Sequence, residues 1–230
     1  MSTRLFAAVF TLTALFTGHD TSAQLIIQGP PTSVTGVVAF ADFDSGLDSH
    51  VCFQPTYTIE CSGNLFFIQS ATVDLADYVG QNVKLEMYNP YVACPSFEVT
   101  AVIETLPAAL ELCGTPEGLG CSWRVRSSPG GISQHFLFAS ISPGFAPLAP
   151  EKGSFLLGSP FLTVASTVSV DAEGAAFDLV TPGDASLIGL DVWVQAARRD
   201  VGPIVAPFAL SNSVCFEVVG FVFVCHQPDC

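Results

Sequence analysis

Residues 81–89 read QNVKLEMYN and residues 96–104 read SFEVTAVIE, and in both stretches apolar side chains occupy every second position. In the first stretch these positions are Val83, Leu85 and Met87. A period of two is the pattern of a β-strand that buries one face and exposes the other. The alternation recurs along the chain between turns rich in glycine, proline and aspartate, so we predict an all-β fold.

Helix-forming patterns are nearly missing. The one short candidate is residues 73–81, VDLADYVGQ, where we expect one or two helical turns with Asp74 near their start.

The candidate strands fall into two blocks on either side of a segment rich in cysteine and glycine. We predict a small OB-like β-barrel over residues 24–108, a linker over 109–121, and an antiparallel β-sandwich over 122–230. Both modules are small enough to need further stabilisation, which the cysteines would supply.

The chain begins with a segment typical of a secretory signal peptide, residues 1–23. Arg4 provides the positive charge near the start, an apolar stretch follows, and small residues surround the expected cleavage point after Ala23. The apolar stretch is too short to span a membrane. We therefore expect a secreted protein, extracellular or at the cell surface, without membrane insertion.

The chain is strongly acidic, with a formal net charge of −14. An acidic surface repels phosphate backbones, so we exclude nucleic acid as a partner. Half of the residues are hydrophobic and only 12% are charged. Such a composition favours stacked sheets, or an apolar surface that meets a partner.

Eight cysteines in an exported chain predict four disulfides. Their spacing favours the pairs Cys113–Cys121 and Cys215–Cys225. A zinc site is the competing interpretation, but the chain has no C-x-x-C pair. The eight residues are Cys52, Cys61, Cys94, Cys113, Cys121, Cys215, Cys225 and Cys230.

Three longer stretches resemble secreted bacterial proteins built from two β modules. Residues 70–89, SATVDLADYVGQNVKLEMYN, resemble a recurrent turn and strand of small OB-like barrels. Residues 185–200 and 208–219 resemble the last two strands of a β-sandwich, with a Leu-x-Gly-x-x-x-x-x-Gln motif and then Leu-Ser-Asn. The resemblance implies a two-module β architecture and export, and it implies no catalytic residue.

Residues 42–50 read DFDSGLDSH and allow three interpretations. Asp-Ser-Gly occurs in aspartic proteases, but those enzymes need a second copy, which is missing here. Asp42, Asp44 and Asp48 would supply oxygen ligands to calcium, although the full calcium-loop pattern is also missing. We favour a turn, because aspartate, serine and glycine all stabilise turns.

The strand around Trp193 offers a candidate ligand site. Alternation places Asp191, Trp193 and Gln195 on one face, opposite the apolar face. If that face is exposed, the indole would stack on a sugar ring while its neighbours bind hydroxyl groups. The alternative is that Trp193 packs against the barrel or another subunit. Tyr88 and Tyr91 flank a loop tip where OB-like barrels bind ligands, or they simply pack the loop.

We expect a non-enzymatic structural or adhesive protein that binds an extracellular polysaccharide or a surface protein, or that associates with itself. Arg198 and Arg199 would neutralise nearby acids or contact an acidic patch on another copy. A carbohydrate-binding protein is the first alternative, and a hydrolase whose site assembles in space is the second. We expect no cofactor, apart from calcium if the aspartate loop binds it.

Overall fold

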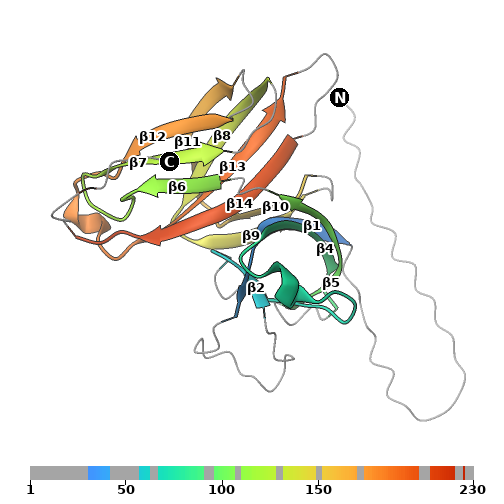
Figure 1. The fold of residues 1–230 in the computed structure, drawn as a ribbon. Helices are drawn as coiled ribbons and strands as arrows, with labels where there is room; N and C mark the ends of the chain where they lie inside the picture. Colours follow the sequence, from blue (N-terminus) through green and yellow to red (C-terminus); the bar gives the residue numbers. More distant parts are fainter. Residues whose placement is uncertain are drawn as a thin grey trace, which may run out of the picture.

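A computed structural model describes most of the chain after residue 30 (Figure 1). The described residues are 31–41, 57–62, 67–90, 96–106, 110–127, 132–148, 152–169, 174–201, 208–220 and Cys225. Within them the chain forms β-strands and two short 3₁₀ helices, which confirms the predicted all-β class.

The first five strands form a closed barrel in the order β1-β2-β3-β5-β4. Neighbouring strands are antiparallel, except that β3 and β5 run parallel. The strands are β1 (Thr32–Phe40), β2 (Tyr57–Ile59), β3 (Phe67–Gln69), β4 (Asn82–Tyr88) and β5 (Ser96–Leu106).

The barrel core follows from the alternation in the sequence. Val83, Leu85 and Met87 of β4 are fully buried, as the period of two predicts. The short helix η3 (Leu75–Tyr78) contributes the buried side chain of Leu75 to the same core. Its N-cap is Asp74, whose Oδ1 accepts a hydrogen bond of 3.1 Å from the backbone N–H of Ala76. The predicted helical turn at Asp74 is therefore confirmed.

A second module follows the barrel, and two of its sheets pack face to face. The four-stranded sheet has the order β11-β8-β13-β14 and the three-stranded sheet the order β12-β7-β6. Their shared core contains Trp123, Val125, Leu137, Phe177 and Val194. The strands are β6 (Leu110–Gly114), β7 (Ser122–Ser127), β8 (Ser133–Ser140), β11 (Phe161–Ser169), β12 (Ala175–Val180), β13 (Asp191–Asp200) and β14 (Phe208–Glu217), and the 3₁₀ helix η4 (Ala185–Leu187) precedes β13.

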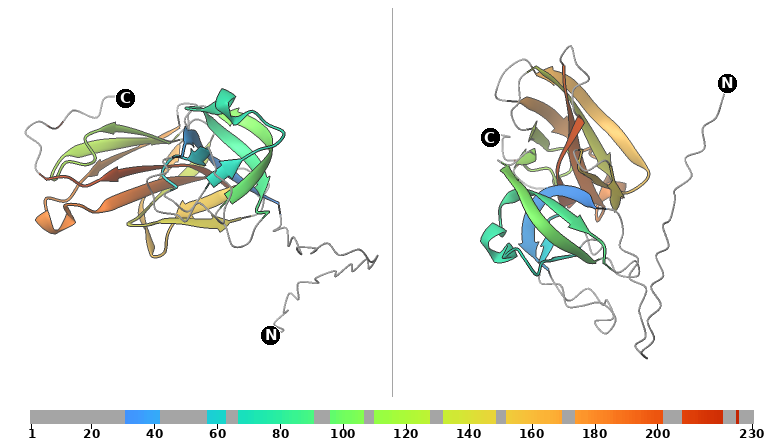
Figure 2. Two further views of the ribbon diagram at one scale, coloured as in Figure 1. Left: turned by 90° about the horizontal axis from the view of Figure 1, so that it is seen from below. Right: turned by 90° about the vertical axis from the view of Figure 1, so that its right-hand side faces the viewer.

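A hairpin of β9 (Pro143–Pro147) and β10 (Ser154–Leu157) lies at the junction of the barrel and the four-stranded sheet (Figures 1 and 2). Leu156 of β10 is fully buried in the barrel core, and Phe145 of β9 packs against Phe97 with ring centroids 5.1 Å apart. The Ser154 hydroxyl donates a hydrogen bond to the carbonyl of Ser33 in β1. The hairpin thus fills the space between the two modules with apolar and hydrogen-bonded contacts.

Two sequence predictions about the second module need correction. Strand β6 lies inside the predicted linker 109–121 and pairs with β7, so the first half of that segment belongs to the three-stranded sheet. Both predicted disulfide pairs are wrong. The structure joins Cys61 to Cys215 and Cys121 to Cys225, with Cα–Cα distances of 5.4 and 5.5 Å.

The disulfides tie distant parts of the chain. Cys61, beside β2, links the barrel to Cys215 of β14. Cys113 is also disulfide-bonded, and none of the described cysteines is free. Local spacing misled the prediction because strands far apart in sequence lie side by side in both modules. Cys52, Cys94 and Cys230 lie outside the described residues.

Candidate functional site

Several residues predicted to form sites lie outside the described part of the chain. These are Asp42, Asp44 and Asp48, together with Tyr91 and the signal peptide 1–23. Tyr88 ends strand β4 and is half-buried. Among the described residues, no cluster of three histidine, cysteine or acidic side chains is arranged to hold a metal ion. The calcium and loop-ligand predictions therefore stay predictions.

The predicted sugar-binding face on β13 is only partly exposed. Asp191 is exposed, Trp193 is half-buried, and Gln195 is completely buried. The condition that the sequence set for a sugar site, an exposed face at these three positions, is met at Asp191 and is not met at Gln195. Trp193 lies directly opposite Cys215, the residue that is linked to the barrel. This position favours the packing interpretation of Trp193.

The Gln195 side chain is bound to backbone groups on two other strands. Its Oε1 accepts a 2.9 Å hydrogen bond from the N–H of Leu156, and its Nε2 donates to the carbonyls of Ser154 and Ser211 at 3.2 and 2.8 Å. A buried amide with these partners is satisfied and has a structural role. Asn212, in the Leu-Ser-Asn motif of residues 210–212, also binds backbone groups. Its Oδ1 accepts a 2.9 Å hydrogen bond from the N–H of Leu110, and its Nδ2 donates to the carbonyl of Leu110.

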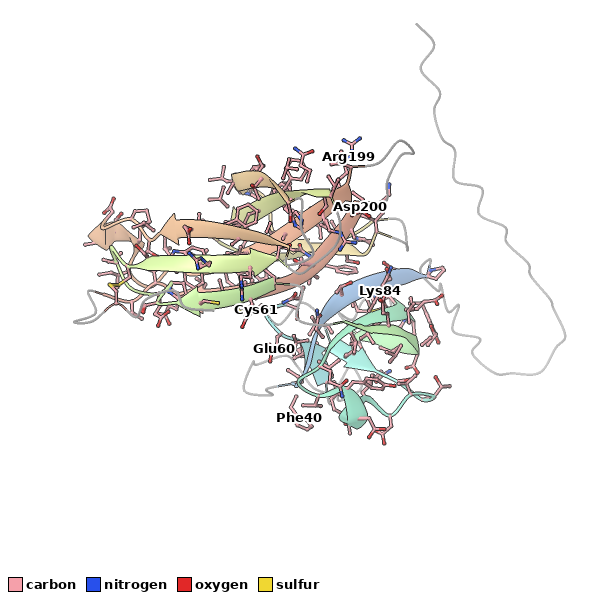
Figure 3. All side chains as sticks on the ribbon, turned by 45° about the horizontal axis from the view of Figure 1, so that its top comes forward. Phe40, Glu60, Cys61, Lys84, Arg199 and Asp200 are labelled. Carbon is pink, nitrogen blue, oxygen red and sulfur yellow. A yellow bond between two sulfur atoms is a disulfide. The ribbon has the colours of Figure 1, made fainter. Side chains whose placement is uncertain are left out.

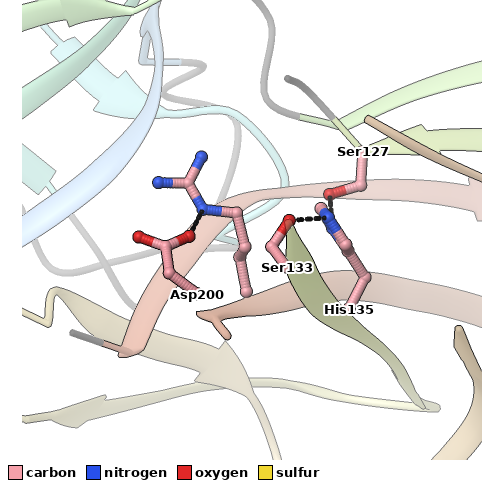
Figure 4. Close-up of polar contacts among 5 residues, drawn as sticks. Ser127, Ser133, His135 and Asp200 are labelled. Atoms are coloured by element: carbon pink, nitrogen blue, oxygen red, sulfur yellow. Dashed lines mark hydrogen bonds and ion pairs between the residues drawn. The ribbon is translucent and has the colours of Figure 1, made fainter. Parts of the chain in front are cut away.

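His135 lies in a buried polar cluster between the two facing sheets (Figure 4). Its Nδ1 lies 3.0 Å from the Ser127 hydroxyl and its Nε2 lies 2.8 Å from the Ser133 hydroxyl. Burial lowers the pKa of His135, and the positive charge of Arg198 lowers it further, while Asp200 acts in the opposite direction. The imidazole is therefore neutral near pH 7, with one nitrogen donating and the other accepting.

A serine next to a histidine is the contact expected in a hydrolase, so its surroundings matter. Here both ring nitrogens lie within hydrogen-bonding distance of serine hydroxyls, and no hydrogen bond joins either nitrogen to a carboxylate of the described residues. Ser133 and His135 are fully buried, and Ser127 is nearly so. Asp200 instead pairs with Arg198, at 3.2 Å between Oδ1 and Nε (Figure 4). The cluster is buried and connects the two sheets, because Ser127 belongs to β7 and the other two residues belong to β8.

The clearest exposed feature is strand β11. Its outer edge and faces present large apolar side chains to solvent: Leu162 is 71% exposed and Val168 is 56% exposed. Ile132 and Ile141, next to the two ends of the neighbouring strand β8, are also exposed, at 57% and 63%. We call this surface the β11 face and define it by Ile132, Ile141, Phe161, Leu162, Val164 and Val168.

The β11 face belongs to an uncharged part of an acidic chain. Between residues 127 and 170 the charged side chains are Glu151 and Lys152, whose charges cancel. The net charge of −14 therefore comes entirely from the rest of the chain. Sequence reasoning missed this surface, although the run of residues with only two charged side chains is visible in the sequence and would have indicated it.

Aromatic packing holds the start of β11 in place. Phe161 packs on Phe155 of the β9–β10 hairpin with ring centroids 4.7 Å apart, and on Phe138 of β8 at 5.9 Å. Phe138 and Phe155 also contact each other at 5.5 Å. The β11 face is thus anchored to the four-stranded sheet and to the junction between the modules.

A second exposed aromatic group lies on the barrel. Phe40 ends β1, is 65% exposed, and stacks on Tyr57 of β2 with ring centroids 5.6 Å apart. Figure 3 shows Phe40 on the side of the barrel remote from the two-sheet module. The exposed ring of Phe40, supported by the half-buried Tyr57, offers an apolar surface that suits a ring-shaped ligand.

No family model, curated protein or solved structure matches this chain. Among the described residues, no helix is both long and apolar enough to cross a membrane. The disulfides indicate an oxidising compartment of the extracellular kind. The functional conclusion therefore depends on the surfaces described above.

Proposed function

We propose that this protein is a secreted, non-enzymatic structural or adhesive component of the extracellular space or cell surface. It acts through binding or self-assembly. The observation that carries the proposal is the β11 face, an exposed apolar surface in the uncharged part of an acidic chain. Contiguous exposed apolar surfaces of soluble proteins commonly mark interaction sites.

We propose in addition that the first module is an OB-like barrel and the second a β-sandwich. The closed order β1-β2-β3-β5-β4 with its parallel β3/β5 pair supports the first assignment. The core shared by the four-stranded and three-stranded sheets supports the second. In this arrangement the barrel and the β11 face are separate surfaces, each free to bind.

The test is retention of the protein on immobilised layers, measured with a quartz crystal microbalance. The layers are an insoluble polysaccharide, an alkyl surface and the protein itself. The wild-type chain is expected to be retained on at least one layer. The variant Val164→Glu/Val168→Glu, which puts charge on the β11 face, is expected to lose at least about tenfold in retention. Ile103→Glu changes a similarly exposed residue of barrel strand β5 and is the control.

The proposal is wrong if no layer retains the wild-type protein, or if the charged variant is retained as well as the wild type. An equal loss for Ile103→Glu would also contradict it, because added negative charge alone would then explain the effect.

Carbohydrate binding is the second candidate function, and the pair Phe40–Tyr57 favours it. OB-like barrels bind oligosaccharides on the face and loops around their second and third strands, and Tyr57 begins β2. A titration with soluble polysaccharides tests this function. Phe40→Ala is expected to abolish binding, while Trp193→Ala is expected to preserve it. The reverse result would return the site to Trp193, as the sequence alone predicts.

A further inference from the structure

We propose that strand β11 pairs edge to edge, antiparallel, with the β11 strand of a second copy of this chain. The inference rests on the proposed binding function and names its partner. It would join the two four-stranded sheets into one continuous sheet that runs across both copies.

The first support is the position of β11 in its sheet. It is the terminal strand of the order β11-β8-β13-β14, and within the described residues it pairs only with β8. A terminal strand carries a row of backbone N–H and C=O groups that its own sheet leaves unpaired. From Ala165 to Ser169 the register with β8 is unbroken, so this part of the edge is regular.

The second support is the composition of the strand. Proteins protect exposed edges with lysine, proline, bulges or inward-pointing charges. Residues 161–169, FLTVASTVS, contain no charged residue and no proline, and four of the nine are β-branched. The register with β8 shifts between Thr163 and Ala165, and this shift is the only one of these protective features in the strand. The edge is therefore long, apolar and weakly protected.

The third support is charge, and it selects a second copy as the partner. Two chains of net charge −14 repel each other at most orientations. Strand β11 itself carries no charge, so the repulsion between two copies is smaller at its edge than where acidic side chains face each other, and the nearest acids in sequence, Asp171 and Glu173, lie beyond its end. A two-fold axis at β11 brings two uncharged strands together and satisfies both strand edges with the same contact. A basic partner would instead be drawn to the charged remainder of the chain.

The fourth support is that β11 needs little ordering before it binds. The contacts of Phe161 with Phe138 and Phe155 hold the first residue of β11 in place. At the other end of β11, the Ser169 hydroxyl donates a hydrogen bond to the carbonyl of Gly174. A segment held at both ends loses little conformational entropy on association.

The experiment uses the secreted full-length mature chain and light scattering after size exclusion, over a concentration series. The wild type is expected at twice the mass of one chain. Val164→Glu/Val168→Glu places like charges on both edges and should weaken the dimer at least about a hundredfold, since like-charge contacts cost several kcal/mol. Val164→Lys/Val168→Lys should also be monomeric. An equimolar mixture of the two variants should restore the dimer, because opposite charges then face each other.

Hydrogen exchange on the wild type gives a second readout that needs no variant. Amides of residues 161–169 should exchange more slowly at concentrations where the dimer forms than at high dilution, whereas those of barrel strand β4 should not change. The control Ile103→Glu should remain dimeric.

Three outcomes overturn the inference: a wild-type monomer at all concentrations, a dimer that survives the glutamate variant, or a variant mixture that stays monomeric. A different result is a wild type that is monomeric, is retained on polysaccharide or alkyl layers, and loses that retention in the Val164→Glu/Val168→Glu variant. In that case a second copy is not the partner, and the proposed binding function stands. If no layer retains it, the proposed function fails as well.

Discussion

Gln195 joins three strands through one side chain, since it sits on β13 and bonds to the backbones of β10 and β14. Gln195→Ala would leave the Leu156 N–H without its partner and open a cavity. We expect the free energy of unfolding to fall by about 2–4 kcal/mol. Chemical denaturation measures it. Asp191→Ala, at an exposed position of the same strand, should change it by less than about 0.5 kcal/mol. Equal effects of the two changes would contradict the structural role.

His135 makes stability depend on pH. Burial and Arg198 lower its pKa in the folded protein, whereas in the unfolded chain the pKa is near its ordinary value of about 6.5. Below that pH the unfolded chain binds a proton that the folded protein resists. Stability from this group is therefore fully present above about pH 6.5 and declines as the pH falls toward the lowered folded pKa.

Thermal unfolding between pH 7.5 and 5 tests the role of His135. The wild type should lose more stability over this interval than His135→Asn, which has no titrating ring. Identical pH dependence for both proteins would show that His135 does not contribute.

Among the elements, β4 and β5 show what alternation predicts well. Each has one face in the barrel core and one face outward, so their period of two is visible in the sequence. Strand β13 shows where the same reasoning fails. Val194 and Ala196 face the shared core, while Gln195 is covered by the β9–β10 hairpin. Both faces of β13 are buried there, and alternation cannot indicate which element covers the second face.

Two elements were missed for different physical reasons. Strand β9 begins and ends with proline, a residue that cannot donate to a ladder and usually signals a loop. Strand β6 contains the disulfide-bonded Cys113 and is followed by a glycine-rich turn, and these features gave the segment the appearance of a linker. The disulfide partners are set by the packing of distant strands, so spacing along the chain did not reveal them.

Gly36 permits the close approach of β1 and β2 in the barrel. A Cβ at this position would collide with Cγ2 of Ile59, a fully buried core residue. We expect Gly36→Ala to lower the free energy of unfolding by about 1–3 kcal/mol. In an Ile59→Ala background the same change should cost less, because the colliding methyl group is gone. Additive effects in a double-mutant cycle would contradict this explanation.

At the scale of the whole molecule, the Cys61–Cys215 disulfide and the β9–β10 hairpin hold the two modules together. Peptide mapping of the unreduced protein should yield one fragment linking Cys61 to Cys215 and another linking Cys121 to Cys225. Removing the first link with Cys61→Ser/Cys215→Ser should lower the free energy of unfolding by about 2–5 kcal/mol. Fragments linking Cys113 to Cys121, or Cys215 to Cys225, would contradict the structure.

Two contacts between copies have been considered, one through the β11 face and one through the exposed side chain of Arg199 (Figure 3), and they differ in charge. Arg198 already pairs with Asp200 on its own strand, which agrees with local neutralisation. Contact through Arg199 and an acidic patch would be an attraction between opposite charges, and salt would weaken it. Contact through β11 brings two acidic molecules together at an uncharged strand, and salt would screen the repulsion between them.

The most direct measurement is the dissociation constant of the dimer at low and high sodium chloride, by analytical ultracentrifugation. If acidic copies meet at the β11 face, the constant should fall as salt rises, because only repulsion between net charges of −14 is screened. A dissociation constant that rises with salt would contradict it and point to a charged contact, and a protein that stays monomeric at every salt concentration would rule the contact out.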